Sequence, residues 1–356
     1  MSHPAPGKPW ITANQVTLAR LIPMPLLVWL LYKGYHDGFD KPLLWGALIA
    51  GTFVGSTDWI DGMLARKQGP TVLGGLLDPI ADKVFIAFAY TPFADLGKIS
   101  WLACALLFTR EFFITALRSA YEQRDLTLKT SYLAKAKTWA QMQGIGVMLL
   151  FPLVEDKRWL IGLMIAGIAA PLVAMAVLWI ARRKFWRGAV VMSLSFVAAL
   201  AVFLYDEAYA PRAILIGVVA ITWISGVDYI AIGWKQLRGR GDFRLADGVR
   251  LVGSLSLPIL LFSVLHYTDV WRPAIFTILA FELSVGGLDN LLSHHKVATL
   301  ALAWGGRVLG ISILLGGALL LPAQAEALTI VAALVSVFGV SAEFYRGRDY
   351  YKGAVS

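Results

Sequence analysis

Apolar residues dominate long stretches of this chain, and short polar segments interrupt them at regular intervals. Each stretch is roughly 20 residues long, the length that an α-helix needs to cross the hydrocarbon core of a bilayer. No alternation at the period of a β-strand competes with the helical pattern. The pattern predicts an all-α, polytopic membrane helix bundle of about twelve spans, near residues 15–35, 43–66, 76–97, 99–121, 132–154, 158–181, 188–205, 211–234, 247–267, 271–293, 297–321 and 325–343.

The composition leaves little of the chain outside these spans. It has 356 residues, of which 58% are hydrophobic and 15% charged, and the mean hydropathy is +0.67. Any chemistry therefore has to lie on the helices or at their ends. The single cysteine, Cys104, lies in an apolar run, which excludes a disulfide framework and a cysteine-based metal site. We expect the polar segment 1–9 to be retained, because no small-residue cleavage site follows the first apolar run.

The net charge of +9 is unevenly distributed. Lys and Arg gather in alternate connections, most densely at 182–187 and 235–244, whereas the other connections hold few. Short loops rich in these residues stay on the cytoplasmic side of a membrane. The alternation therefore predicts that both termini are cytoplasmic and that the basic loops contact anionic lipid. It gives no reason to expect nucleic-acid binding.

Four aspartates lie on the facing ends of two successive apolar runs. Asp58 and Asp61 are three residues apart, and Asp78 and Asp82 are four apart, so each pair projects from one face of a helix. The two helices are antiparallel and joined by a short turn, which brings both pairs to a similar depth near the cytoplasmic surface. The sequence therefore predicts that the four carboxylates converge.

Four uncompensated negative charges at this depth would be costly. Arg66 and Lys83 can offset part of the charge, and one or two divalent cations would offset the rest. Ligands that are all oxygen favour Mg²⁺ or Mn²⁺. The small residues Gly62 and Ala65 would let a bulky ligand or a neighbouring helix approach the carboxylates closely. The competing interpretation is a helix-packing face whose charges simply reach toward the membrane surface.

The same segments, 58–66 and 74–82, read D-x2-D-G-x2-A-R and G-x3-D-x3-D. This resembles the signature of the CDP-alcohol phosphatidyltransferases, and the resemblance extends over roughly 10–155 and 211–240. The seven-residue spacer between the two halves is shorter than the eight or more residues usual in that family. Since the spacer falls in the turn, the carboxylates are unaffected.

The resemblance implies a role for each aspartate. Asp58, Asp61 and Asp78 would hold two metal ions that bridge the pyrophosphate of a CDP-lipid. Asp82 would be the general base that deprotonates the acceptor hydroxyl, and it would also contact a metal. The remaining nucleotide contacts implied by the family fall on Gly62, Ala65, Arg66, Gly74 and, in the N-x2-T-x2-R segment at 14–20, Thr17.

Two further segments resemble the phosphatidylglycerophosphate synthase branch of the family. Residues 110–118 match R-E-x5-L-R, and residues 134–141 match G-K-x-K-T-x2-Q except that alanine replaces the first glycine. The resemblance implies that Arg118, Lys135 and Lys137 bind the phosphate of the acceptor. The alternative is that these cations only orient the chain in the membrane.

The chain is longer than this resemblance requires. The last helix of the family pattern recurs at 222–229, so residues 1–240 would form the catalytic domain with an inserted helix pair near 158–205. Residues 241–356 are predicted to be a degenerate membrane repeat of about four helices.

Two segments of this part resemble segments of the first part. Residues 249–258 are similar to residues 19–26, and residues 287–294 are similar to residues 60–66. In this alignment Asp289 keeps one aspartate of the four, so we expect the repeat to be catalytically silent and to act in packing, stability or assembly.

These observations predict a multi-pass cell-membrane phosphatidyltransferase whose active site faces the cytoplasm. The expected reaction moves a phosphatidyl group from CDP-diacylglycerol to sn-glycerol 3-phosphate and releases CMP and phosphatidylglycerophosphate. Inositol phosphate and phosphatidylglycerol are alternative acceptors, and a non-enzymatic transporter is the alternative from another class. The expected partners are the CDP-lipid, a phosphorylated alcohol and membrane lipid, and a homodimer is compatible with this interpretation.

Overall fold

The structure is a computed structural model in which residues 12–36, 38–69, 71–124, 126, 132–240, 244–295 and 299–352 are described. Regular structure in these residues is helical throughout, as the apolar pattern predicts. The elements are α1 (Ala13–Ala19), α2 (Met24–His36), α3 (Lys41–Gln68), α4 (Val72–Asp95), α5 (Trp101–Glu122), α6 (Tyr132–Leu153), α7 (Lys157–Arg182), α8 (Arg187–Tyr205), α9 (Ala210–Arg240), α10 (Leu245–Tyr267), α11 (Arg272–His294), α12 (Thr299–Leu320), η1 (Pro322–Gln324), α13 (Ala325–Arg346) and α14 (Arg348–Lys352).

Every predicted apolar run coincides with a helix, and the first run divides into α1 and α2. Within the described residues, eight segments are long and apolar enough to cross a membrane. Helices α4 and α5 are not among them, because α4 carries Asp78, Asp82 and Lys83, and α5 carries Arg110, Glu111 and Arg118. Both helices carry residues of the predicted site, whereas α1 and α3, which carry Thr17, Asp58 and Asp61, belong to the eight segments.

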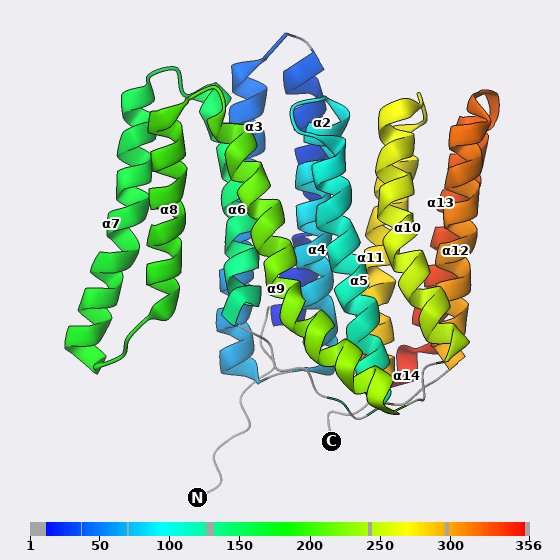
Figure 1. Cartoon of the computed structure of the whole chain (residues 1–356). Coiled ribbons are helices and arrows are strands. Elements are labelled where there is room, and N and C mark those ends of the chain that lie inside the picture. The colour runs from blue at the N-terminus through cyan, green and yellow to red at the C-terminus, as the bar shows by residue number, and fades with distance from the viewer. Residues whose placement is uncertain are drawn as a thin grey trace, which may run out of the picture.

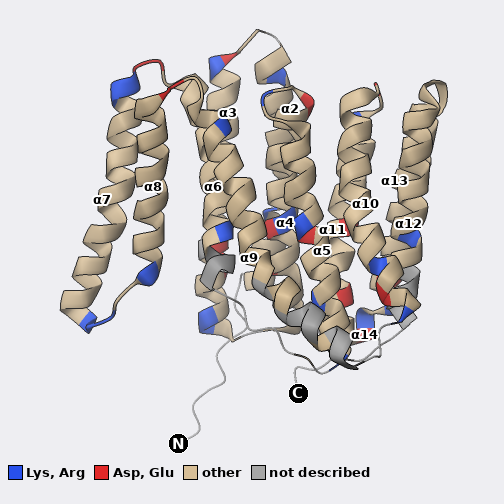
Figure 2. Ribbon diagram, viewed as in Figure 1, with Lys and Arg blue, Asp and Glu red and all other residues tan. Residues whose placement is uncertain are grey.

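The long helices stand side by side, and α4 and α5 lie near the middle of the bundle (Figure 1). Charged residues gather on the central helices and at helix ends, while the lengths of α7 and α8 are free of them (Figure 2). Helices α7 and α8 pack on each other at one edge of the bundle, and α6 packs directly on α9. One link to the bundle is a hydrogen bond of 3.2 Å from Trp139 Nε1 on α6 to Ser195 Oγ on α8.

The C-terminal helices continue the central core. Helix α10 packs between α5 and α12, and α11 packs against α4 and α5. The rings of Phe108 on α5 and Phe262 on α10 stack with centroids 5.6 Å apart, and both are buried. Residues 241–356 are therefore built into the same hydrophobic core as the segments with the aspartate motif.

A buried ion pair ties two of these C-terminal helices together. Arg250 Nη2 on α10 lies 2.9 Å from Asp289 Oδ1 on α11, and their side chains are 0% and 3% exposed. These are the residues that the predicted repeat aligns with Arg20 and Asp61 of the first part.

We predict that Asp289→Ala destabilises the protein by about 3–5 kcal/mol, because removing one partner leaves the Arg250 guanidinium buried and uncompensated. Thermal unfolding in detergent checks this. The control is Asp269→Ala, since the Asp269 side chain is 96% exposed and its pairing with Arg272 contributes little. Equal melting temperatures for the two variants would contradict a structural role for the Arg250–Asp289 pair.

Candidate active site

The turn between α3 and α4 brings the two halves of the aspartate motif together. Gly69 adopts a φ of 90°, a conformation that favours glycine, and its N–H donates to the Ala65 carbonyl 2.9 Å away. Thr71 caps α4 by accepting a hydrogen bond of 2.9 Å from the Gly74 N–H. Helix α1 packs against both α3 and α4. The antiparallel pair and α1 together enclose the four predicted aspartates.

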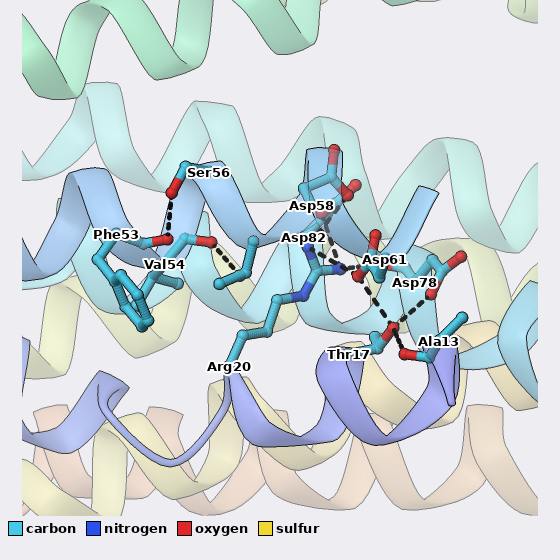
Figure 3. Close-up of polar contacts among 11 residues, drawn as sticks. Ala13, Thr17, Arg20, Phe53, Val54, Ser56, Asp58, Asp61, Asp78 and Asp82 are labelled. Carbon is cyan, nitrogen blue, oxygen red and sulfur yellow. Dashed lines mark hydrogen bonds and ion pairs between the residues drawn. The ribbon is translucent and has the colours of Figure 1, made fainter. Parts of the chain in front are cut away.

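Thr17 of α1 lies between two of the carboxylates. Its Oγ1 is 3.0 Å from Asp61 Oδ2 and 2.9 Å from Asp78 Oδ1, and it also lies 3.1 Å from the Ala13 carbonyl oxygen (Figure 3). A hydroxyl has one proton to donate, so Thr17 hydrogen-bonds one of these oxygens at a time. The predicted site residue Thr17 therefore joins the two halves of the motif.

Arg20, which ends α1, points into the centre of the cluster (Figure 3). Its Nη1 lies 3.1 Å from Asp58 Oδ1 and 3.9 Å from Asp61 Oδ2. Its Nη2 lies 3.1 Å from Asp82 Oδ1 and donates to the Asp78 carbonyl oxygen at 3.1 Å. One buried guanidinium thus contacts all four residues, as the sequence led us to expect of a divalent cation.

The counter-charges differ from those that the sequence suggested. Arg66 is exposed on α3, and Lys83 donates a 2.7 Å hydrogen bond to Thr115 Oγ1. In the described part of the chain, the ion pairs of the four aspartates are with Arg20. Of the N-x2-T-x2-R segment at 14–20, only Thr17 was predicted to be a site residue, although Arg20 is the last fixed position of that segment.

The donor set suits a hard divalent cation, because it consists of carboxylates whose oxygens such ions prefer. One guanidinium does not balance four aspartates, and the side chains of Asp58 and Asp82 are 52% and 39% exposed. Within the described residues, no group of three or more Asp, Glu, His or Cys side chains is arranged to hold one metal ion. Arg20 lies between the carboxylates in this arrangement.

The small residues of the motif serve different purposes. Gly62 is on α3 beside Asp61, where an added Cβ would lie 3.7 Å from Arg66 Nη1, so space remains for a ligand. An added Cβ at Gly74 would lie 2.9 Å from Asn14 Oδ1 and 3.0 Å from Thr71 Oγ1. Gly74 is therefore required for the close approach of α1 to α4.

A cavity of about 370 Å³ lies beside the aspartate cluster and shares Asp82 with it. The cationic residues that line it are Lys83 of α4, Arg110 and Arg118 of α5, and Lys137 of α6. We call this space the cationic cavity. Two of the three predicted phosphate ligands, Arg118 and Lys137, are thus brought together, while the side chain of Lys135 lies outside the described residues.

A single buried carboxylate organises these cations. Glu111 Oε1 lies 2.5 Å from Lys137 Nζ and 3.3 Å from Arg110 Nη1. Arg110 Nη2 also donates to Ser225 Oγ on α9 at 2.8 Å, and the Arg118 guanidinium lies over the Tyr229 ring, 5.6 Å from its centroid. The cations outnumber the carboxylates in this cavity, which favours an anionic ligand.

A second, larger cavity of about 610 Å³ reaches the cluster from another direction. It lies between α3 and α6, where Gly51, Gly55 and Gly146 keep the helices open and Ile145 and Leu149 make the walls apolar. Among the residues that line it, Asp58 is charged and belongs to the aspartate cluster. We call this space the apolar groove, and it connects a surface of membrane helices to the carboxylates.

The fold and site define a membrane protein in which clustered carboxylates adjoin a cationic cavity and an apolar groove. The sequence profile of the CDP-alcohol phosphatidyltransferase family matches residues 10–170, and this chain belongs to that family. No solved structure matches it.

Three relatives illustrate the extent of the similarity. The "Probable phosphatidylglycerophosphate synthase" of Mycobacterium tuberculosis (strain H37Rv) is 38% identical over 140 residues, which cover 39% of this chain and 65% of the relative. The "CDP-diacylglycerol--glycerol-3-phosphate 3-phosphatidyltransferase" of Rickettsia typhi is 30% identical over 38% of this chain and 75% of its own length. A protein of the same name from Yersinia enterocolitica is 33% identical over 36% and 70%. The chain thus spans somewhat less than two thirds of the mycobacterial relative.

We predict that Gly74→Ala lowers the melting temperature, because the added methyl group displaces Asn14 or the Thr71 cap of α4. Gly75→Ala is the matched control, since nothing lies within 4 Å of an added Cβ there. Alanine at that position is expected to leave stability unchanged or raise it by about 0.5–1 kcal/mol through its better helix propensity. Thermal unfolding of both variants checks this, and a Gly74→Ala protein as stable as Gly75→Ala would refute the packing role.

Proposed function

We propose that this protein transfers a phosphatidyl group from CDP-diacylglycerol to sn-glycerol 3-phosphate and releases CMP. The observation that carries the proposal is the position of Asp82, which belongs both to the carboxylate cluster and to the wall of the cationic cavity. A transfer between two phosphate-bearing substrates needs one site for each, with a proton acceptor between them.

The carboxylate cluster is the proposed donor site. Asp58, Asp61, Asp78 and Asp82 would hold Mg²⁺ or Mn²⁺, as two ions. When bound, these ions neutralise the charge of the pyrophosphate and of the departing CMP. The apolar groove that ends at Asp58 suits the acyl chains of the donor, because a lipid has to present its phosphates to the cluster while its chains stay in an apolar environment.

The cationic cavity is the proposed acceptor site. Its volume suits a small phosphorylated alcohol, and Lys83, Arg118 and Lys137 supply charged donors for a phosphate group. Lys135 is proposed as a further phosphate ligand from the sequence. Glu111 keeps Lys137 and Arg110 in place by its ion pairs, which limits their movement when the acceptor enters.

Asp82 is proposed as the general base. The acceptor hydroxyl oxygen attacks the β-phosphorus of the donor, its proton passes to Asp82, and the bond from that phosphorus to the CMP oxygen breaks. Arg20 and Thr17 hold the carboxylates in position before the substrates bind. We further propose that the site faces the cytoplasm, because the basic connections predicted to be cytoplasmic lie at this end of the helices.

The family membership and the names of the relatives support this acceptor over the alternatives. Inositol phosphate carries the same phosphate and remains the nearest alternative, whereas phosphatidylglycerol would bring two more acyl chains to a cavity of about 370 Å³. A transporter would need no cluster of carboxylates joined to a separate cationic cavity.

The proposal is tested by CMP release from CDP-diacylglycerol with purified protein and each acceptor in turn. We expect release with sn-glycerol 3-phosphate, its loss on chelation of divalent cations, and its recovery with Mg²⁺ or Mn²⁺. Asp82→Asn is the matched control, and its rate should fall on the order of 10²-fold or more because the proton acceptor is gone. CMP release with inositol phosphate and not with sn-glycerol 3-phosphate would show that inositol phosphate is the acceptor. Near-normal turnover of Asp82→Asn would refute the role of Asp82 as general base.

We predict that Arg118→Ala raises the KM for the acceptor roughly 10- to 100-fold, because a lost hydrogen bond between charged groups costs about 1.5–3 kcal/mol. The KM for CDP-diacylglycerol should change far less. Arg212→Ala, at an exposed position near the start of α9, is the control for a general loss of positive charge. An acceptor KM that is the same in both variants would remove Arg118 from the acceptor site.

A further inference from the structure

The cationic cavity has a wall that comes from the C-terminal part of the chain. Gly286, Gly287 and Asn290 of α11 line it together with residues of α4, α5 and α6. The family profile ends at residue 170, so α11 lies outside the segment that it matches. The space proposed to receive the acceptor is therefore partly enclosed by a helix that the family pattern does not include.

The two glycines bring the backbone of α11 into direct contact with the helices that carry the cations. An added Cβ at Gly287 would lie 2.8 Å from Ile80 Cγ1 on α4, and one at Gly286 would lie 3.1 Å from Thr115 Cγ2 on α5. Thr115 is the residue whose hydroxyl accepts the hydrogen bond from Lys83. Side chains at either glycine would push α11 away from the cavity, so the close approach depends on both.

Asn290 follows one turn after these glycines and faces the same side of α11. Its Oδ1 is buried and, within the described residues, has no hydrogen-bond partner. The preceding residue, Asp289, is held by Arg250 in the buried ion pair, which fixes the rotation of α11 about its axis. A buried carboxamide oxygen without a partner is unfavourable unless a ligand or water supplies the missing donor.

The chemistry of the cavity indicates what that donor is. The cations Lys83, Arg118 and Lys137 suit the phosphate of the ligand, and Asp82 suits the hydroxyl that reacts. An amide oxygen accepts a hydrogen bond and so suits a neutral O–H group. A phosphorylated polyol carries such a hydroxyl in addition to the one that is transferred.

We propose that α11 completes the acceptor site and that Asn290 Oδ1 accepts a hydrogen bond from the non-reacting hydroxyl of a phosphorylated polyol. This rests on the proposed function, and it assigns the C-terminal part of the chain a role in substrate selection besides its role in packing. The predicted repeat keeps one aspartate of the four, yet it would contribute a substrate-binding residue to the first site.

The test compares two acceptors in two proteins. The acceptors are sn-glycerol 3-phosphate and 3-hydroxypropyl phosphate, which lacks the middle hydroxyl. In the wild-type protein, we expect removal of this hydroxyl to raise the acceptor KM on the order of tenfold. Asn290→Leu, of similar size, should raise the KM for sn-glycerol 3-phosphate by a similar factor, leave the KM for CDP-diacylglycerol within about twofold, and show no further loss with 3-hydroxypropyl phosphate.

Ser284→Ala is the matched control on the same helix, because its hydroxyl donates to the Ala280 carbonyl within α11 and does not line the cavity. Thermal unfolding verifies that each variant is folded, and Asn290→Ala, which adds no bulk, replaces Asn290→Leu if the latter is unstable. Unchanged kinetics in the Asn290 variant, or equal losses with both acceptors, would overturn the inference while leaving the proposed function intact. A wild-type protein that releases no CMP with any phosphorylated alcohol would overturn both.

Discussion

The arrangement of the site depends on one buried guanidinium. Arg20 is 4% exposed and lies among four aspartates that would otherwise repel one another. Its planar group has donors in several directions, so it contacts the carboxylates of α3, the Asp82 carboxylate of α4 and the Asp78 carbonyl oxygen at once. Because one positive charge leaves the cluster negative on its more exposed side, the same interaction that holds the helices together keeps the cluster attractive to cations.

Charge separation over a short distance follows from this arrangement. The aspartate cluster is negative and the neighbouring cavity is positive. Asp82 and Lys83 are consecutive residues of α4, and Asp82 belongs to the cluster while Lys83 lines the cavity. Consecutive positions on a helix point about 100° apart, so one helix can supply both environments. Glu111 stabilises the cations of the cavity, and Arg20 stabilises the carboxylates of the cluster. Each is a single opposite charge among several like charges.

The C-terminal helices hold a buried ion pair of their own. Arg250 and Asp289 occupy the aligned positions of Arg20 and Asp61, and they form a buried pair with no excess charge. The pair serves packing, and the glycines beside it let α11 reach the cationic cavity of the first part. A segment interpreted from the sequence as silent in chemistry is therefore part of the wall of the cavity.

The sequence by itself determined the helical class, the positions of the helices and the convergence of the four aspartates. These follow from the apolar runs, from the spacing of the aspartates along each helix and from the short turn between two antiparallel helices. The resemblance also predicted that Arg118 and Lys137 lie together, and both line the cationic cavity. Only the tertiary structure decided that Arg20 forms ion pairs with the aspartates while Lys83 lines the cationic cavity, since both residues carry the same charge and lie in apolar runs. It alone placed α11 against α4 and α5, because Gly286 and Asn290 are distant from the motif in sequence and only the packing of the helices brings them to the cavity.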